Sequence, residues 1–100
     1  MKVYNISFQI DPVVEFQWLE WMKNNFIPKV IACQSFSDHK LYQIEVQADQ
    51  SPTYTLQLYC DNIELWQSYQ QLHASTHLKE VQVTWGEKCF YFCTEMQIVN

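Results

Sequence analysis

The fold is decided by residues 3–26, VYNISFQIDPVVEFQWLEWMKNNF, in which one hydrophobic periodicity replaces another. From residue 3 to residue 10, apolar and polar side chains alternate, as in a strand with one buried face. Asp11 then suits the cap of a helix, and Pro12 suits its first turn. The apolar side chains that follow recur every three or four positions, which predicts a helix over residues 12–25. This stretch is therefore a strand followed by a helix, each with one apolar side.

Working outward, the same two periodicities recur along the rest of the chain. Alternation predicts three further strands, at residues 41–47, 53–60 and 89–99. Asp61 and Glu64 have capping-box spacing before a second amphipathic helix, whereas residues 74–88 are expected to form a less regular connection. The order βαββαβ predicts an α+β, ferredoxin-like fold, with a four-stranded antiparallel sheet and both helices on one face. Residues 1–100 are expected to form one such domain.

Composition excludes several classes of function. Hydrophobic residues make up 48% of the chain and the net charge is -5, which excludes a disordered protein. No run of apolar residues is long enough to cross a membrane. All six basic residues are lysines, spread along the chain, so no guanidinium is present to read bases or to clamp phosphate. We therefore expect neither nucleic acid nor a membrane as a partner.

The cysteines and the first residues bear on the cellular compartment. The four cysteines match no zinc or haem motif, and the opening MKVYNISFQIDP lacks the apolar core of a signal peptide; the cysteines are Cys33, Cys60, Cys89 and Cys93. In the reducing cytosol such thiols stay free. The sequence therefore predicts a cytoplasmic protein without a bound cofactor.

No predicted element covers the side of the sheet away from the helices, so its composition indicates what it contacts. It is expected to be polar, without lysine, and lined by Asn5, Ser7, Gln9, His39, Leu41, Gln43, Glu45, Gln47, Thr55, Gln57, Tyr59, Cys89, Tyr91, Cys93, Glu95 and Gln97. An exposed sheet face normally carries interspersed lysine and glutamate, so this composition favours a covered face. We expect two copies to pair sheet to sheet as a dimeric α/β barrel; the alternative is a solvated, glutamine-rich sheet.

Three segments resemble a known family. VYNISFQIDP, WLEWMKNNFIPKV and GEKCFYFCTEMQIV are similar to the domain-of-unknown-function 4286 family, small bacterial proteins expected to form dimeric α/β barrels. The likeness extends from Tyr4 to Val99. The matching motif residues are Trp18, Trp21, Met22, Ile27, Pro28, Phe92 and Thr94. Cys93 stands where the family pattern is expected to have a basic residue. The resemblance implies the fold and the pairing, but no activity.

His73 and His77 have the spacing that places two imidazoles on one helix face, as in some metal sites. A third ligand is missing from the pattern, and the residues between them weaken the expectation that the helix reaches His77. The alternative is a helix end at which histidine complements the dipole. We therefore expect no metal.

Several titratable groups could meet inside a paired barrel and act as general acid or base: His39, Glu45, Tyr59, Tyr91 and Glu95. His73 is a further candidate. Structural hydrogen bonding within the dimer would explain the same residues.

The favoured interpretation is a homodimeric α/β-barrel protein with its sheet face open to a small neutral or weakly polar ligand. Two alternatives remain: a cofactor-independent oxygenase or isomerase, and a purely structural or regulatory interaction domain. A ligand-sized cavity would separate the first two from the third.

Overall fold

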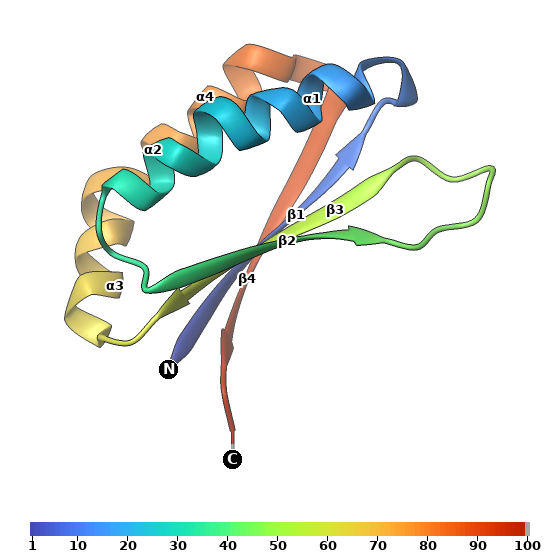
Figure 1. The fold of residues 1–100 in the computed structure, drawn as a ribbon. Helices are drawn as coiled ribbons and strands as arrows, with labels where there is room; N and C mark the ends of the chain where they lie inside the picture. Colours follow the sequence, from blue (N-terminus) through green and yellow to red (C-terminus); the bar gives the residue numbers. More distant parts are fainter. Residues whose placement is uncertain (100) are drawn as a thin grey trace.

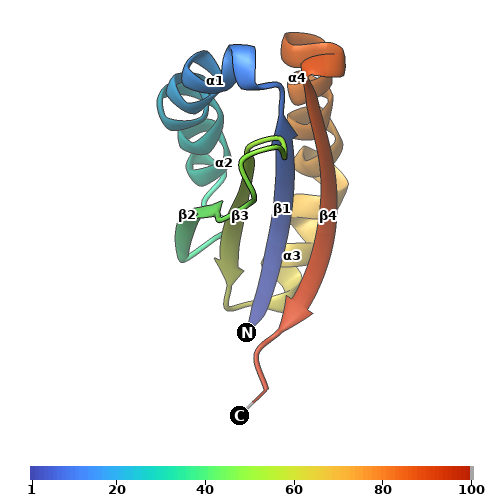
Figure 2. The same cartoon turned by 90° about the vertical axis from the view of Figure 1, so that its right-hand side faces the viewer.

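Four antiparallel strands form one layer of the molecule, and the helices all lie on one side of it (Figure 1, Figure 2). This computed structural model describes residues 1–99. The strands are β1 (Lys2–Ile10), β2 (Asp38–Ile44), β3 (Thr53–Cys60) and β4 (Cys89–Gln97). Their spatial order is β2-β3-β1-β4, so β2 and β4 are the edges. The predicted βαββαβ order and ferredoxin-like plan are confirmed.

The first helical segment begins as predicted and ends later than predicted. Asp11 caps it, because its Oδ1 accepts a hydrogen bond from the Val13 N–H at 2.9 Å. Its consecutive parts are the 3-10 turn η1 (Pro12–Val14), α1 (Glu15–Trp21), the π turn η2 (Met22–Phe26) and α2 (Ile27–Ala32). The helical backbone therefore continues well past residue 25, up to the positive φ of Gln34.

The π turn in this segment has a local cause. Pro28 has no N–H to donate to the carbonyl of Asn24, four residues earlier, and its ring crowds that carbonyl. A wider turn just before Pro28 relieves the conflict, and the Ile27 N–H bonds to the Met22 carbonyl, five residues back. The proline predicted to open a further turn thus does so within one helix.

The second helical segment differs from the prediction at both ends. Its cap is Asn62 rather than Asp61: the Asn62 Oδ1 accepts from the N–H groups of Glu64 and Leu65. Its parts are α3 (Ile63–Tyr69), the π turn η3 (Gln70–Ala74), α4 (Ser75–Trp85) and the 3-10 turn η4 (Gly86–Lys88). The prediction of an irregular connection over residues 74–88 was wrong. Packing of the buried His77 and Val81 overrides the low helix propensity nearby.

Strand β2 lies earlier in the chain than predicted, at residues 38–44 rather than 41–47. Its pairing with β3 runs from Asp38 opposite Tyr59 to Ile44 opposite Thr53. Residues 45–52 form the connection to β3, which projects beyond the rest of the sheet (Figure 1).

The core lies between the sheet and the helices. The central strands supply alternate side chains and the helices supply large aromatic and aliphatic ones; those with under 2% of their surface exposed include Ile6, Phe8, Ile10, Leu56, Leu58, Trp18, Met22, Phe26, Val30, Tyr69 and Val81. Trp18 and Trp66 are buried, and Trp21 and Trp85 are partly buried and pack against the core. Within residues 1–99, no helix combines the length and apolarity needed to span a membrane.

Candidate functional site

The open face of the sheet is the side turned away from the helices, and strand register determines which residues lie on it. Residues directly opposite one another on paired strands share a face. Tyr4, Ile6 and Phe8 belong to the core, so the odd-numbered residues of β1 face the other way. Register then places on the open face Val3, Asn5, Ser7, Gln9, Asp38, Lys40, Tyr42, Ile44, Thr53, Thr55, Gln57, Tyr59, Phe90, Phe92, Thr94 and Met96.

This set corrects the predicted lining on both edge strands. The predictions for β1 and β3 are right, but those for β2 and β4 are reversed. His39 and Leu41 of β2 are opposite Leu58 and Leu56, which face the helices. Cys89, Tyr91, Cys93 and Glu95 of β4 are opposite Ile10, Phe8, Ile6 and Tyr4, which face the helices too. Gln43 shares the helix side, Gln97 pairs with Lys2 on that side, and Glu45 and Gln47 lie beyond the end of β2.

The physical reason is that alternation shows which residues share a face, but not which face is buried. In the edge strands Tyr42, Ile44, Phe90, Phe92 and Met96 point away from the helices, whereas Leu41 and Tyr91 pack against the core. The expectation of a face without lysine was also wrong, because Lys40 is opposite Gln57. Both faces of each edge strand carry apolar or aromatic residues, so the sequence offers no clear signal for which face is buried.

Exposed apolar side chains run along both edges of the open face. On β4, Phe90 is 66% exposed and Phe92 63%, and Met96 follows. On β2, Tyr42 and Ile44 are also exposed. We call these five residues the apolar borders. Apolar residues so placed leave contiguous patches that mark interaction surfaces in soluble proteins.

Between the borders, short polar side chains form a closed hydrogen-bonded set. The Thr55 hydroxyl donates to Asn5 Oδ1 at 2.6 Å, and Asn5 Nδ2 donates to Ser7 Oγ at 3.2 Å. Ser7 Oγ in turn lies 3.4 Å from Thr55 Oγ1. Ser7 and Thr55 are buried although no helix covers this side, because their longer neighbours surround them. Together with Gln57, we call these residues the polar centre.

Gln57 is oriented by its neighbour along the strand. The Tyr59 hydroxyl donates to Gln57 Oε1 at 2.8 Å, which leaves the amide nitrogen facing away from that bond. Among the hydrogen bonds of residues 1–99, none uses Gln57 Nε2. The side-chain oxygens of Asn5 and Gln57 each accept one hydrogen bond, while the N–H groups of Gln57 donate none.

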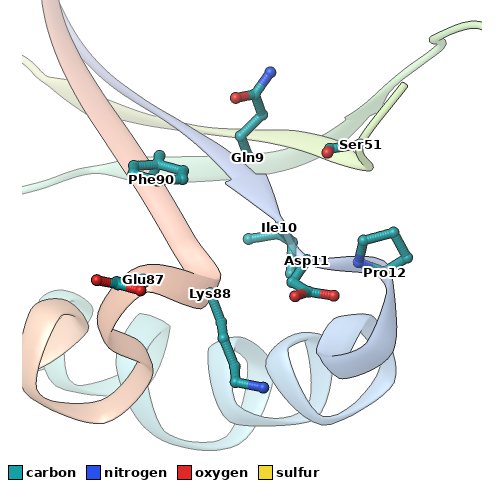
Figure 3. Close-up of a pocket in the computed structure, with 8 residues that line it drawn as sticks. All are labelled: Gln9, Ile10, Asp11, Pro12, Ser51, Glu87, Lys88 and Phe90. Carbon is teal, nitrogen blue, oxygen red and sulfur yellow. The ribbon is translucent and has the colours of Figure 1, made fainter. Parts of the chain in front are cut away.

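A cleft of about 260 Å³ adjoins one end of the open face (Figure 3). Gln9 and Phe90, which are opposite each other on β1 and β4, form its sheet side. It is lined by Gln9, Ile10, Asp11, Pro12, Ser51, Glu87, Lys88 and Phe90. The Asp11 carboxylate is engaged in capping, and the other polar residues of the lining are Gln9, Ser51, Glu87 and Lys88.

The predicted acid-base candidates do not converge. Tyr59 is on the open face, whereas His39, Tyr91 and Glu95 are on the helix side. Glu95 pairs with Lys2 at 3.0 Å. Glu45 lies in the connection after β2. The convergence expected inside a barrel is therefore wrong for this set.

His73 and His77 do lie together, on a helix that continues past both. Their rings are stacked with centroids 6.1 Å apart, and His77 Nδ1 is 2.8 Å from the Tyr69 hydroxyl. Burial, with a smaller contribution from His73, lowers the pKa of His77. No group of three histidine, cysteine or acidic residues within residues 1–99 is arranged to hold a metal ion. The contacts of His73 and His77 are therefore those of side chains that pack within the helix layer.

The thiols are free, and their surroundings differ. Burial raises the pKa of Cys89 to about 11, against a smaller opposing effect of Trp18. Cys93 is exposed, and the Tyr4 hydroxyl donates to its sulfur at 3.3 Å. Partial desolvation of the sulfur on the helix side of β4 raises the pKa of Cys93 as well, against a smaller opposing effect of the Tyr4 hydrogen bond, so neither thiol is activated as a nucleophile at neutral pH.

Solved structures similar to the chain share its fold. A dimeric ferredoxin-like protein from an uncultured marine organism has a TM-score of 0.69 at 11% identity, covering 100% of this chain and 96% of that one. An ethyl tert-butyl ether d family protein from Bacillus halodurans has a TM-score of 0.66 at 17% identity, over 97% and 100%. A protein provisionally named an antibiotic biosynthesis monooxygenase, from Deinococcus radiodurans, has 0.67 at 7%, over 100% and 94%. At these identities the likeness shows the fold alone.

No curated protein matches the chain. The model of the family described as "Domain of unknown function (DUF4286)" matches residues 1–99. This match confirms the resemblance carried by the first strand, the first helix and the last strand. The chain therefore belongs to the DUF4286 family.

Proposed function

We propose that two copies of this chain pack the open faces of their sheets together as a dimeric α/β barrel, and that the enclosed space binds a small uncharged or weakly polar molecule. The observation that carries the proposal is the pair of apolar borders on a side that no helix covers. Charged residues on this face are confined to Asp38 and Lys40 of the edge strand β2, and interface centres are depleted of charge in the same way.

The size of the open face supports a second copy as its occupant. Four strands about 4.8 Å apart, with about eight residues each, give a flat footprint of roughly 500 Å². Side chains standing on that footprint add accessible surface, which brings the face toward the roughly 800 Å² per partner of a stable interface. A two-fold dimer also matches an identical face with itself, so both pairs of apolar borders are covered at once.

The polar centre favours a space that binds a ligand over a space that is filled by packed side chains. Short side chains in the middle and long ones at the edges leave space between two facing sheets. A purely structural or regulatory dimer would fill that space with packed side chains. We infer a cytoplasmic location from the free thiols, and a single domain from the one sheet shared by all four strands.

Phe92→Asp tests the dimer, with Phe16→Asp as its matched control. Phe92 is 63% exposed on the open face, and Phe16 is 73% exposed on α1, in the helix layer. A carboxylate at residue 92 would be buried without a partner in the dimer, so we expect the dimer dissociation constant to rise at least about tenfold. Light scattering after size exclusion at micromolar concentration should show a wild-type and a Phe16→Asp dimer, and a Phe92→Asp monomer. A monomeric wild type would overturn the proposal.

The second candidate function is a cofactor-independent oxygenase or isomerase. Tyr59 favours it, because this residue alone of the predicted acid-base set faces the enclosed space and its hydroxyl is already fixed on Gln57. If Tyr59 is the acid or base, Tyr59→Phe should abolish oxygenase or isomerase turnover while leaving the dimer intact. Unchanged turnover by that variant would exclude Tyr59 as the acid or base.

A further inference from the structure

Residues that lie opposite one another on paired strands form rows across the sheet, and these rows show which side chains of different strands lie side by side. Register aligns Lys40, Gln57, Asn5 and Thr94 across all four strands, so this row is polar from edge to edge. The next row along the strands aligns Tyr42, Thr55, Ser7 and Phe92, with an aromatic ring at each edge and hydroxyls between. A polar row therefore lies beside a row with aromatic ends.

We propose that these two rows form a recognition site for a flat, uncharged carbonyl compound, with the Gln57 side-chain amide donating a hydrogen bond to the carbonyl oxygen and Tyr42 and Phe92 bordering the rings. This inference rests on the proposed function, because the second sheet closes the site.

The free hydrogen-bond donor of the polar centre determines which polar group the ligand needs. Thr55 occupies the Asn5 carbonyl oxygen, and Tyr59 occupies that of Gln57. One N–H of Asn5 is engaged by Ser7, so within residues 1–99 Gln57 is the side-chain amide of the polar centre with both N–H groups free. A buried donor without an acceptor is costly, so a ligand with an acceptor oxygen is favoured over one without.

The distance between the apolar borders limits the size and shape of the ligand. β2 and β4 are separated by two other strands, which places their backbones about 14 Å apart. A fused ring system of two or three rings fits between aromatic side chains at that separation. Lys40 is the charged residue of the two rows and lies on the exposed β2 edge, with Asp38 two residues away on the same face, so the middle of the site carries no charge, which favours a neutral compound.

9-Fluorenone and fluorene test the inference directly, because both are flat tricyclic molecules and they differ only in the carbonyl group. We expect the wild-type dimer to bind fluorenone roughly tenfold more tightly than fluorene, as one desolvated hydrogen bond allows. Equilibrium dialysis measures both dissociation constants, and light scattering on the same samples reports the dimer.

Gln57→Leu removes the donor, and Gln57→Met removes it while keeping the length of the side chain and adding no charge. Both variants should lose the preference for fluorenone and remain dimers. Gln43→Leu is the matched control, because Gln43 is also exposed on a strand but lies on the helix side of β2, and it should keep the preference.

The outcomes separate the two proposals. A dimer that binds both compounds equally, or neither, overturns the carbonyl site while the dimer proposal stands. Retention of the preference in both Gln57 variants also overturns it. A monomeric wild type overturns the proposed function, and the inference falls with it.

Discussion

At the scale of single residues, His77 and Tyr69 form a buried polar pair between the helices and the sheet. Both side chains are buried, and the Tyr69 hydroxyl meets His77 Nδ1 at 2.8 Å. Burial, reinforced by His73 and Lys29 and opposed by Glu80, lowers the pKa of His77 below its ordinary value. The imidazole therefore functions as a neutral core group rather than as a cation at a helix end.

This lowered pKa predicts a loss of stability in mild acid. Above the ordinary pKa of about 6.5, His77 is neutral in the folded and unfolded chain. As the pH falls below that value, the unfolded chain takes up the proton first, so the free energy of unfolding decreases. Urea unfolding at pH 7.5 and pH 5.5 should show the decrease. His77→Gln should reduce it, and His39→Gln, an exposed control, should not. Equal pH dependence in both variants would contradict the prediction.

At the scale of elements, the helices end at residues with positive φ. Gly86 follows α4 with φ 55 and ψ -129, and Gln34 lies just beyond α2 with φ 60. Only glycine adopts the first conformation readily, and glycine is also the usual residue at the second position. The single glycine of the chain is therefore placed where the backbone requires it.

Exchanges at these two positions should have opposite effects. A Cβ at residue 86 would meet no atom within 4 Å, so Gly86→Ala would cost only backbone strain, about 1–2 kcal/mol. Gln34→Gly removes strain but adds entropy to the unfolded chain, for a net gain of roughly 0.5 kcal/mol. Thermal and urea unfolding measure both. Equal stability of wild type and Gly86→Ala would show that the backbone relaxes at this turn.

Hydrophobic periodicity predicted most of the strands and helices, and the wrong predictions also concern whole elements. The strand at residues 53–60 was predicted to the residue, because its alternation coincides with burial on a central strand. The helix through His77 was missed, because Ser75 and Thr76 have low helix propensity and only packing against the sheet determines their conformation.

At the scale of the whole molecule, the proposed pairing of the open faces predicts that stability depends on protein concentration. If folding is coupled to pairing of the sheets, mass action raises the apparent melting temperature as the chain becomes more concentrated. We expect the midpoint of wild-type thermal unfolding to rise by a few degrees between about 1 and 100 µM, following the size scaling of Tm. The Phe92→Asp variant should show a constant midpoint. A wild-type midpoint independent of concentration would argue against coupling of folding to pairing.

The candidate site could be predicted only in part. Asn5, Ser7, Thr55, Gln57 and Tyr59 were placed correctly, because the two central strands have one clearly apolar side each. The aromatic residues at the edges were assigned to the core instead.

The sequence by itself determined the strands, the helices and their order, because hydrophobic periodicity and capping residues act over a few positions along the chain. It also determined which residues of each strand share a face. Only the tertiary structure decided which face of an edge strand is turned to the helices, because that depends on register with strands distant in sequence. Phe92 and Tyr42 lie on the open face for that reason.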